Sequence, residues 1–126
     1  MRYKGLTLRV LGKSTAAMGP GKADLVERIA RTGSISAAAR EMGMSYRRAW
    51  QLVESLNATF RESVVTTAIG GKRGGGARVT PFGEQLVAAF RAMEEKASAA
   101  IAGDLRRYAT RLRKAAKRWN KTVDRQ

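Results

Sequence analysis

The segment from Gly33 to Gly83 constrains the fold of this chain more than any other feature. It opens with two short helical patterns, separated by Gly43-Met44, and continues into a glycine-rich, basic stretch, GGKRGGGAR, that ends in VTPFG. Apolar residues repeat at three- and four-residue spacing in the helical patterns, whereas β-branched residues dominate just before the glycines. The segment therefore predicts a pair of packed helices followed by a β-hairpin.

Capping residues set the limits of three predicted helices. The first is expected from Pro20 to Gly33, because proline is common at the first helical position and glycine just past the last turn. Ser34 is a candidate N-cap of a second helix that Gly43 ends, and Ser45 is a candidate N-cap of a third. The apolar stripes predicted to face the core are Leu25, Ile29 and Ala30, with Val26 on the flank, then Ile35, Ala38, Ala39 and Met42, then Ala49, Leu52, Val53, Leu56 and Phe60.

The β elements are predicted from alternation and from turn residues. A first strand is expected over about residues 5–11, where apolar and polar residues alternate, and residues 13–21 are expected to form a loop. Residues 63–80 predict a hairpin with Lys72 and Arg73 among the glycines of its tip. The expected fold is mainly α with a small β wing, which is a winged helix-turn-helix.

A long amphipathic helix is expected after the hairpin, with Thr80 as its N-cap and Pro81 at its first position. Its stripe is more apolar than a lone surface helix needs, so we expect a dimer interface there. The alternative is packing on the first strand and first helix of the same chain, and we expect both to hold in part. Gly103-Asp104 is expected to interrupt the helix. The predicted interface residues are Phe82, Leu86, Phe90 and Met93. The predicted domains are 1–82 (winged helix-turn-helix), 83–103 (dimerisation helix) and 104–126 (basic, partly helical tail).

The charge of the chain predicts a polyanionic partner. Lysine and arginine number 25 against 10 acidic residues, which gives a formal net charge of +15. The tail alone holds nine bases and two acids. The tail could pair across a dimer as an amphipathic helix, clamp DNA phosphates, be a partly disordered end or lie on a membrane surface, and these alternatives stay open.

The absence of cysteine and histidine closes most routes to catalysis. It removes disulfides, thiolate or imidazole metal ligands and histidine-assisted nucleophiles. No catalytic residue, metal site or cofactor is predicted, so the chain is not expected to be an enzyme. No apolar run approaches the roughly 20 residues of a membrane span, and the N-terminus lacks the apolar core of a signal peptide, so a cytoplasmic location is expected.

The third predicted helix has the features of a recognition helix. One side carries its apolar stripe, and its exposed first turns can enter a major groove about 12 Å wide. Arginine can pair bidentately with guanine and glutamine with adenine. A merely solvated charged face is the alternative, which the cap, the preceding helix and the hairpin disfavour. The candidate DNA-contacting residues of this helix, here called the recognition face, are Ser45, Tyr46, Arg47, Arg48 and Gln51.

Lys72, Arg73 and Arg78 of the wing are expected to contact phosphates or the minor groove, because the surrounding glycines allow close approach to DNA. The competing interpretation is a nucleotide-binding P-loop at Gly12-Lys13-Ser14. That motif needs a glycine at position 7, where this sequence has Thr7, so ATP binding is not expected.

The motifs GSISAAAREMGMSYRRAWQLVESLN and GGKRGGGARVTPFG closely resemble the N-terminal DNA-binding domain of the ModE family of molybdate-responsive transcription regulators. The likeness covers about residues 18–95. It implies a winged helix-turn-helix related to the LysR-type DNA-binding domain, which dimerises through its C-terminal helix. By position it adds Ser34 and Ser36 to the residues that contact DNA.

Full members of that family continue into oxyanion-binding Mop-type domains, whereas this sequence continues into a basic tail that ends at Gln126. This departure makes molybdate binding doubtful for this chain. We expect a homodimeric, sequence-specific transcription regulator that binds double-stranded DNA in the bacterial nucleoid, with no membrane partner. The alternative is a nucleoid-associated protein that organises DNA with little sequence preference.

Overall fold

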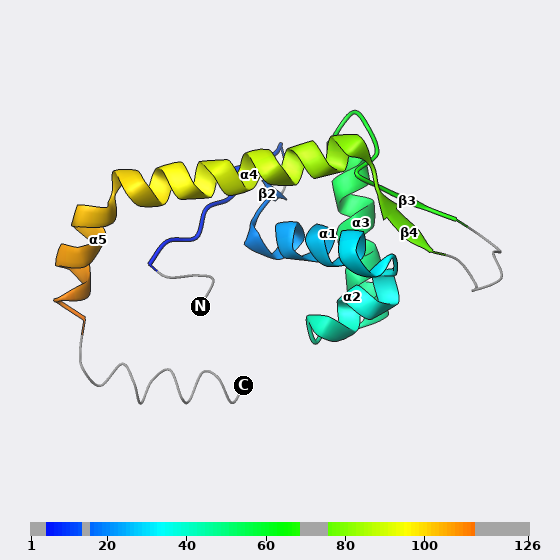
Figure 1. Ribbon diagram of the computed structural model, residues 1–126, viewed down its shortest axis with the longest axis horizontal. Helices are drawn as coiled ribbons and strands as arrows, with labels where there is room; N and C mark the ends of the chain where they lie inside the picture. Colours follow the sequence, from blue (N-terminus) through cyan, green and yellow to red (C-terminus); the bar gives the residue numbers. More distant parts are fainter. Residues whose placement is uncertain (1–4, 14–15, 69–75, 113–126) are drawn as a thin grey trace. The chain divides into compact units, whose positions relative to one another are not determined.

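A computed structural model describes residues 5–13, 16–68 and 76–112 of the chain, and contacts divide the chain into two compact units, Met1–Glu94 and Glu95–Gln126. It confirms the expected class, mainly helical with a small β wing (Figure 1). The elements are β1 (Val10–Leu11), β2 (Ala16–Met18), α1 (Pro20–Thr32), α2 (Ile35–Glu41), α3 (Tyr46–Thr59), β3 (Val65–Thr67), β4 (Ala77–Val79), α4 (Pro81–Ala100) and α5 (Ala102–Ala109).

The core of the first unit lies between α1, α2 and α3, and α4 closes one side of it. Contacts join α1 to α2 and α2 to α3, and the fully buried Ala38 and Ala49 allow the helices to approach closely. From α4, Phe90 is only 1% exposed and Val87 only 6% exposed. The largest fully buried side chains are Phe90, Leu25, Ile29, Leu56, Val26, Val53, Val64 and Val65.

The predicted caps define the helix ends. The hydroxyl of Ser34 accepts a hydrogen bond from the N–H of Ala37 at 3.1 Å, and that of Ser45 accepts one from the N–H of Arg48 at 3.0 Å. The hydroxyl of Thr80 likewise accepts from the third residue that follows it, at 2.9 Å. The glycines in the left-handed region that follow α1 and α2 are Gly33 (φ 70°) and Gly43 (φ 67°).

The wing is an antiparallel pair, β3 and β4, that extends away from the helices (Figure 1). The N–H of Ala77 donates to the carbonyl of Gly33 at 3.0 Å, which anchors β4 to the turn between α1 and α2. Lys72 and Arg73, predicted at the wing tip, lie outside the described residues. The paired residues are Val65 with Val79, Thr66 with Arg78 and Thr67 with Ala77.

The N-terminal part differs from the prediction. The strand expected over residues 5–11 is reduced to β1, and β2 lies within the predicted loop, where Val10 pairs with Met18. Alanine is depleted in strands, so the sequence Ala16-Ala17 gave no signal for β2, which forms because it pairs with β1.

One residue of the predicted inward stripe of α1 lies elsewhere. Ala30 is exposed, whereas Val26, expected on the flank, is buried at 2% exposure. The buried side of α1 is therefore centred nearer Val26, because α1 packs against β4 and α4 as well as α2.

The break after α4 falls at Ile101, two residues before the predicted Gly103. Gly103 and Asp104 lie in the first turn of α5, where the carboxylate of Asp104 interacts favourably with the positive end of the helix dipole. Asp104 also forms an ion pair with Arg107 at 2.5 Å. Gly103-Asp104 therefore marks the start of α5, and the break between α4 and α5 lies just before it.

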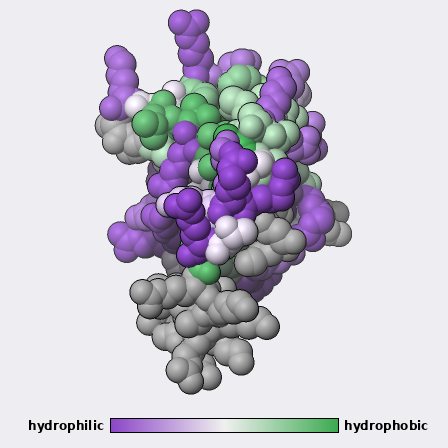
Figure 2. Space-filling model, turned by 90° about the vertical axis from the view of Figure 1, so that its left-hand side faces the viewer, coloured by the Kyte–Doolittle hydropathy of each residue, from purple (hydrophilic) through white to green (hydrophobic). Residues whose placement is uncertain are grey.

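The described part of the face shown in Figure 2 is mostly hydrophilic. Figure 2 shows purple side chains over much of one face, with hydrophobic side chains gathered toward the top of the view. None of the helices among the described residues is long and apolar enough to span a membrane. Among the described residues, the large hydrophobic side chains that are exposed are Leu11, Tyr46, Met93, Tyr108 and Leu112.

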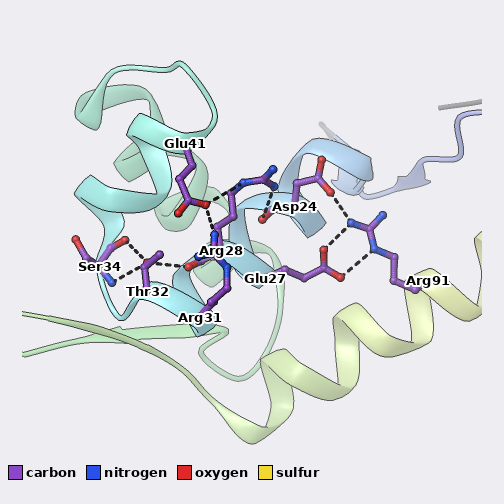
Figure 3. A network of polar contacts seen from close by, with 8 residues as sticks. All are labelled: Asp24, Glu27, Arg28, Arg31, Thr32, Ser34, Glu41 and Arg91. Atoms are coloured by element: carbon purple, nitrogen blue, oxygen red, sulfur yellow. Dashed lines mark hydrogen bonds and ion pairs between the residues drawn. The ribbon is translucent and has the colours of Figure 1, made fainter. Parts of the chain in front are cut away.

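A cluster of charged side chains joins α4 to α1 (Figure 3). The guanidinium of Arg91 donates to Asp24 at 2.5 Å, to Glu27 at 2.9 Å and to Glu94 at 2.8 Å. These hydrogen bonds, that to Glu27 above all, raise the pKa of Arg91, against the opposing effect of burial. A second group in Figure 3 pairs Glu41 of α2 with two arginines of α1. Ion pairs therefore tie α1 to both α2 and α4.

Candidate nucleic-acid interface

The first turns of α3 present every residue of the recognition face to solvent. Their N-cap Ser45 is itself exposed, and its bond to the backbone of Arg48 fixes where the helix starts. The opposite side of α3 is fixed in the core by Ala49, Val53 and Leu56, each at most 1% exposed. The helix is thus held by one side while the other can enter a groove. The exposed residues are Ser45, Tyr46, Arg47, Arg48 and Gln51.

Two aromatic residues lie at this end of α3 and have different surroundings. Tyr46 is 54% exposed, so its ring and hydroxyl are available to a partner. Trp50 is half-buried and packs against the core, which agrees with the packing role that is usual for an indole. Trp50 therefore supports the recognition face and does not belong to it.

In the described part of the chain, Arg47 and Arg48 of the recognition face and Arg78 of the wing are not neutralised by acidic neighbours. Among the described residues, no ion pair involves Arg47, Arg48 or Arg78, all of which are exposed. The described ion pairs instead use arginines of α1, α4 and α5. The positive charge on this side is consequently free to attract phosphates.

The serines of the helix-turn-helix have different positions. Ser34 is half-buried, and its hydroxyl is occupied as the N-cap of α2. Ser36 is half-buried in the first turn of α2. In the wing, Arg78 projects from β4, and its backbone carbonyl lies 3.5 Å from the hydroxyl of Thr66. Contact of Ser34, Ser36 and Arg78 with DNA therefore stays a prediction.

The four predicted interface residues of α4 do not share one environment. Phe90 lies in the core of its own chain, so it offers no surface to a partner. Phe82 and Leu86 are half-buried and pack against that core, and the ring of Phe82 meets Phe60 edge to face at 6.1 Å. Met93 is 42% exposed. Packing within the chain therefore uses much of the stripe, and Met93 is its exposed end.

Some residues near α3 were not singled out from the sequence. Asn57 bonds to the backbone of the segment that forms β3, and Lys22 donates to Ser55 of α3 at 3.3 Å. Arg9 lies next to Gly19 at the start of α1. Each of these contacts joins two separate segments, so the periodicity of a single helix or strand does not reveal it.

Residues 22–84, half of the chain, match the family model of the bacterial regulatory helix-turn-helix proteins of the LysR family. The chain belongs to this family. ModE regulators and MopB are among its relatives, so the matched residues are similar to a ModE-type DNA-binding domain.

Three comparisons show the extent of the likeness. The chain is 53% identical over 85 residues to the molybdenum-pterin-binding protein MopB of Rhodobacter capsulatus, covering 68% of this chain and 32% of MopB. It is 39% identical over 82 residues to the DNA-binding transcriptional dual regulator ModE of Escherichia coli K12, covering 65% of this chain and 30% of ModE. The structure of LysG from Corynebacterium glutamicum aligns with a TM-score of 0.49 at 27% identity, covering 70% of this chain and 29% of LysG. The chain spans about a third of the length of these curated relatives.

Proposed function

We propose that this chain is a transcription regulator that binds specific sequences of double-stranded DNA as a homodimer. The N-terminal half of α3 enters the major groove, where Arg47, Arg48 and Gln51 contact base edges. The wing, with Arg78 and the predicted contacts Lys72 and Arg73, grips the flanking backbone.

The observation that carries this proposal is the exposed, unpaired cationic end of a helix whose other side is fixed in the core. A base-reading helix must be positioned to within a fraction of an ångström, and burial of Ala49, Val53 and Leu56 holds α3 in that way. DNA phosphates attract a cationic surface whatever the base sequence is, whereas bidentate arginine contacts distinguish base pairs. Family membership supports the same function.

The homodimer is supported by the need for two recognition helices and by the exposed end of α4. A twofold dimer places two recognition helices on adjacent half-sites of a palindrome. Met93 supplies exposed apolar surface on the helix that the ModE-type likeness assigns to dimerisation.

The specificity of the recognition face is tested with Arg47→Ala. The preferred sequence is first selected from genomic fragments, and the dissociation constants for it and for random duplex are then measured by gel-shift competition at near-physiological salt. We expect Arg47→Ala to weaken binding to the selected sequence by about 1–3 kcal/mol, because a bidentate contact to one base pair is lost. Binding to random duplex should change much less.

Arg61→Ala is the matched control, because Arg61 is exposed just beyond the other end of α3 and carries the same charge. It should leave the preference for the selected sequence unchanged. Equal losses on both duplexes for Arg47→Ala would contradict a base-reading role, and the absence of any preferred fragment would indicate a protein that coats DNA without selecting sequences.

A further inference from the structure

A basic pocket lies between the start of α1 and α3. It is a cavity of about 280 Å³ that opens to solvent, and its lining includes Arg9, Gly19, Lys22, Met44 and Arg48. Since a water molecule takes about 30 Å³ of the liquid, the pocket has room for a phosphate-sized group together with several waters. We call this cavity the basic pocket.

Three segments bring positive charge to the basic pocket. Arg9 precedes β1, Lys22 lies in the first turn of α1, and Arg48 lies in the first turn of α3. In the part of the chain that the structure describes, no acidic residue lines the cavity and none of these three cations forms an ion pair. Like charges held in one concave site repel one another, and a bound anion removes that cost.

Lys22 is held in place by the protein. Its ammonium donates to the carbonyl of Ala16 at 2.7 Å and to the hydroxyl of Ser55 at 3.3 Å. An ammonium has three N–H donors, so one remains for a ligand. Burial, and then the charge of Arg48, lower the pKa of Lys22.

Arg9 reaches the basic pocket across Gly19. A methyl group added at Gly19 would lie 3.4 Å from Cγ and 3.9 Å from Nε of Arg9, so the arginine side chain lies directly over the glycine. Arg9 is itself exposed, and its guanidinium offers a planar set of donors that suits phosphate oxygens.

We propose that the basic pocket binds a phosphate group through Arg9, Lys22 and Arg48. On DNA this group is a backbone phosphate beside the base pairs that α3 contacts, because Arg48 belongs to both the pocket and the recognition face. That source rests on the proposed function. Free inorganic phosphate offers the same chemistry and does not depend on it, so the two sources are tested separately.

The DNA arm compares Arg9→Gln with the charge-matched control Arg61→Gln. Loss of one phosphate contact should reduce the slope of log affinity against log salt by about one unit. The loss of affinity should be equal on selected and random duplex, because phosphate contacts carry no sequence information. Arg61→Gln should keep the wild-type slope. Equal slope changes in the two variants would show only a diffuse charge effect and would overturn the backbone contact.

The free-phosphate arm measures the melting temperature of the full chain in phosphate and in chloride at equal ionic strength. A ligand that binds only the native state raises the melting temperature. We expect phosphate to raise it for the wild type and for Arg61→Gln, and the increase to be lost in Arg9→Gln. Lys22→Met should lose it too, even if that variant melts lower in both salts.

An effect specific to Arg9 in either arm supports the pocket, and the responding arm identifies the source of the phosphate. No specific effect in either arm overturns the proposal. If the chain binds no duplex at all, the proposed function fails, while the free-phosphate arm still decides the fate of the basic pocket.

Discussion

Arg91 is the residue that fixes α4 against α1. Its three carboxylate partners include Asp24, which is 67 residues away in sequence and only 6% exposed. The recognition face could be predicted from local spacing and charge, because a helix separates its sides at a period of 3.6 residues. The Arg91 cluster could not, since it exists only once α1 and α4 have packed together.

Arg91→Met should destabilise the fold by about 1–3 kcal/mol, because the mostly buried Asp24 would lose its ion pair with Arg91. Breaking a fully buried pair costs about 3–5 kcal/mol. We expect the lower range of about 1–3 kcal/mol because the Arg91 side chain is 20% exposed. Urea unfolding measures the change. Arg107→Met is the control, since the exposed pair with Asp104 should contribute less than about 1 kcal/mol. Similar losses of unfolding free energy in the two variants would show that the Arg91 cluster stabilises the fold no more than an exposed ion pair does.

At the scale of elements, the side chain of Asn57 connects α3 to the segment where the wing begins. The Oδ1 of Asn57 accepts from the N–H groups of Val64 at 2.8 Å and Val65 at 3.2 Å, and its Nδ2 donates to the carbonyl of Val65 at 2.8 Å. The helices themselves were predictable because caps and periodicity are local. The short strand β2 depends on its pairing with β1, and the orientation of the wing depends on contacts with Asn57 and Gly33. The pattern of residues within each strand did not reveal these contacts.

Asn57→Ala should cost about 1–3 kcal/mol of stability, because it leaves buried backbone groups of β3 without partners. Amide hydrogen exchange should accelerate at Val64 and Val65 while α1 keeps its protection. Thr59→Ala is the matched control, because it removes only an exposed hydroxyl bond to the carbonyl of Ser55 within α3. Unchanged exchange in β3 would show that the wing is held by other contacts.

At the scale of the whole molecule, the proposed dimer depends on the exposed end of the α4 stripe. The sequence predicted four interface residues, but packing inside the chain removes Phe90 from that surface. Amphipathic periodicity identifies a face that must be covered, and it does not say whether the same chain or a partner covers it. Met93 is therefore the residue whose substitution distinguishes packing within the chain from contact with a second copy.

Met93→Lys should weaken self-association at least tenfold, or about 1.4 kcal/mol, because it places a charge in an apolar contact. Sedimentation velocity over a range of concentrations measures this. Ala92→Lys adds the same charge at the neighbouring exposed position and should weaken association less. Identical association of both variants and the wild type would exclude this end of α4 from the interface.

The central claim is that the N-terminal end of α3 contacts DNA, and amide chemical-shift mapping with the selected duplex tests it most directly. At about 1.5 Å per residue, the 14 residues of α3 span about 21 Å, so its two ends should respond differently. We predict the largest shifts at Ser45 to Gln51 and little change at Arg61 and Glu62. Shifts that leave residues 45–51 unchanged while others respond would contradict the claim.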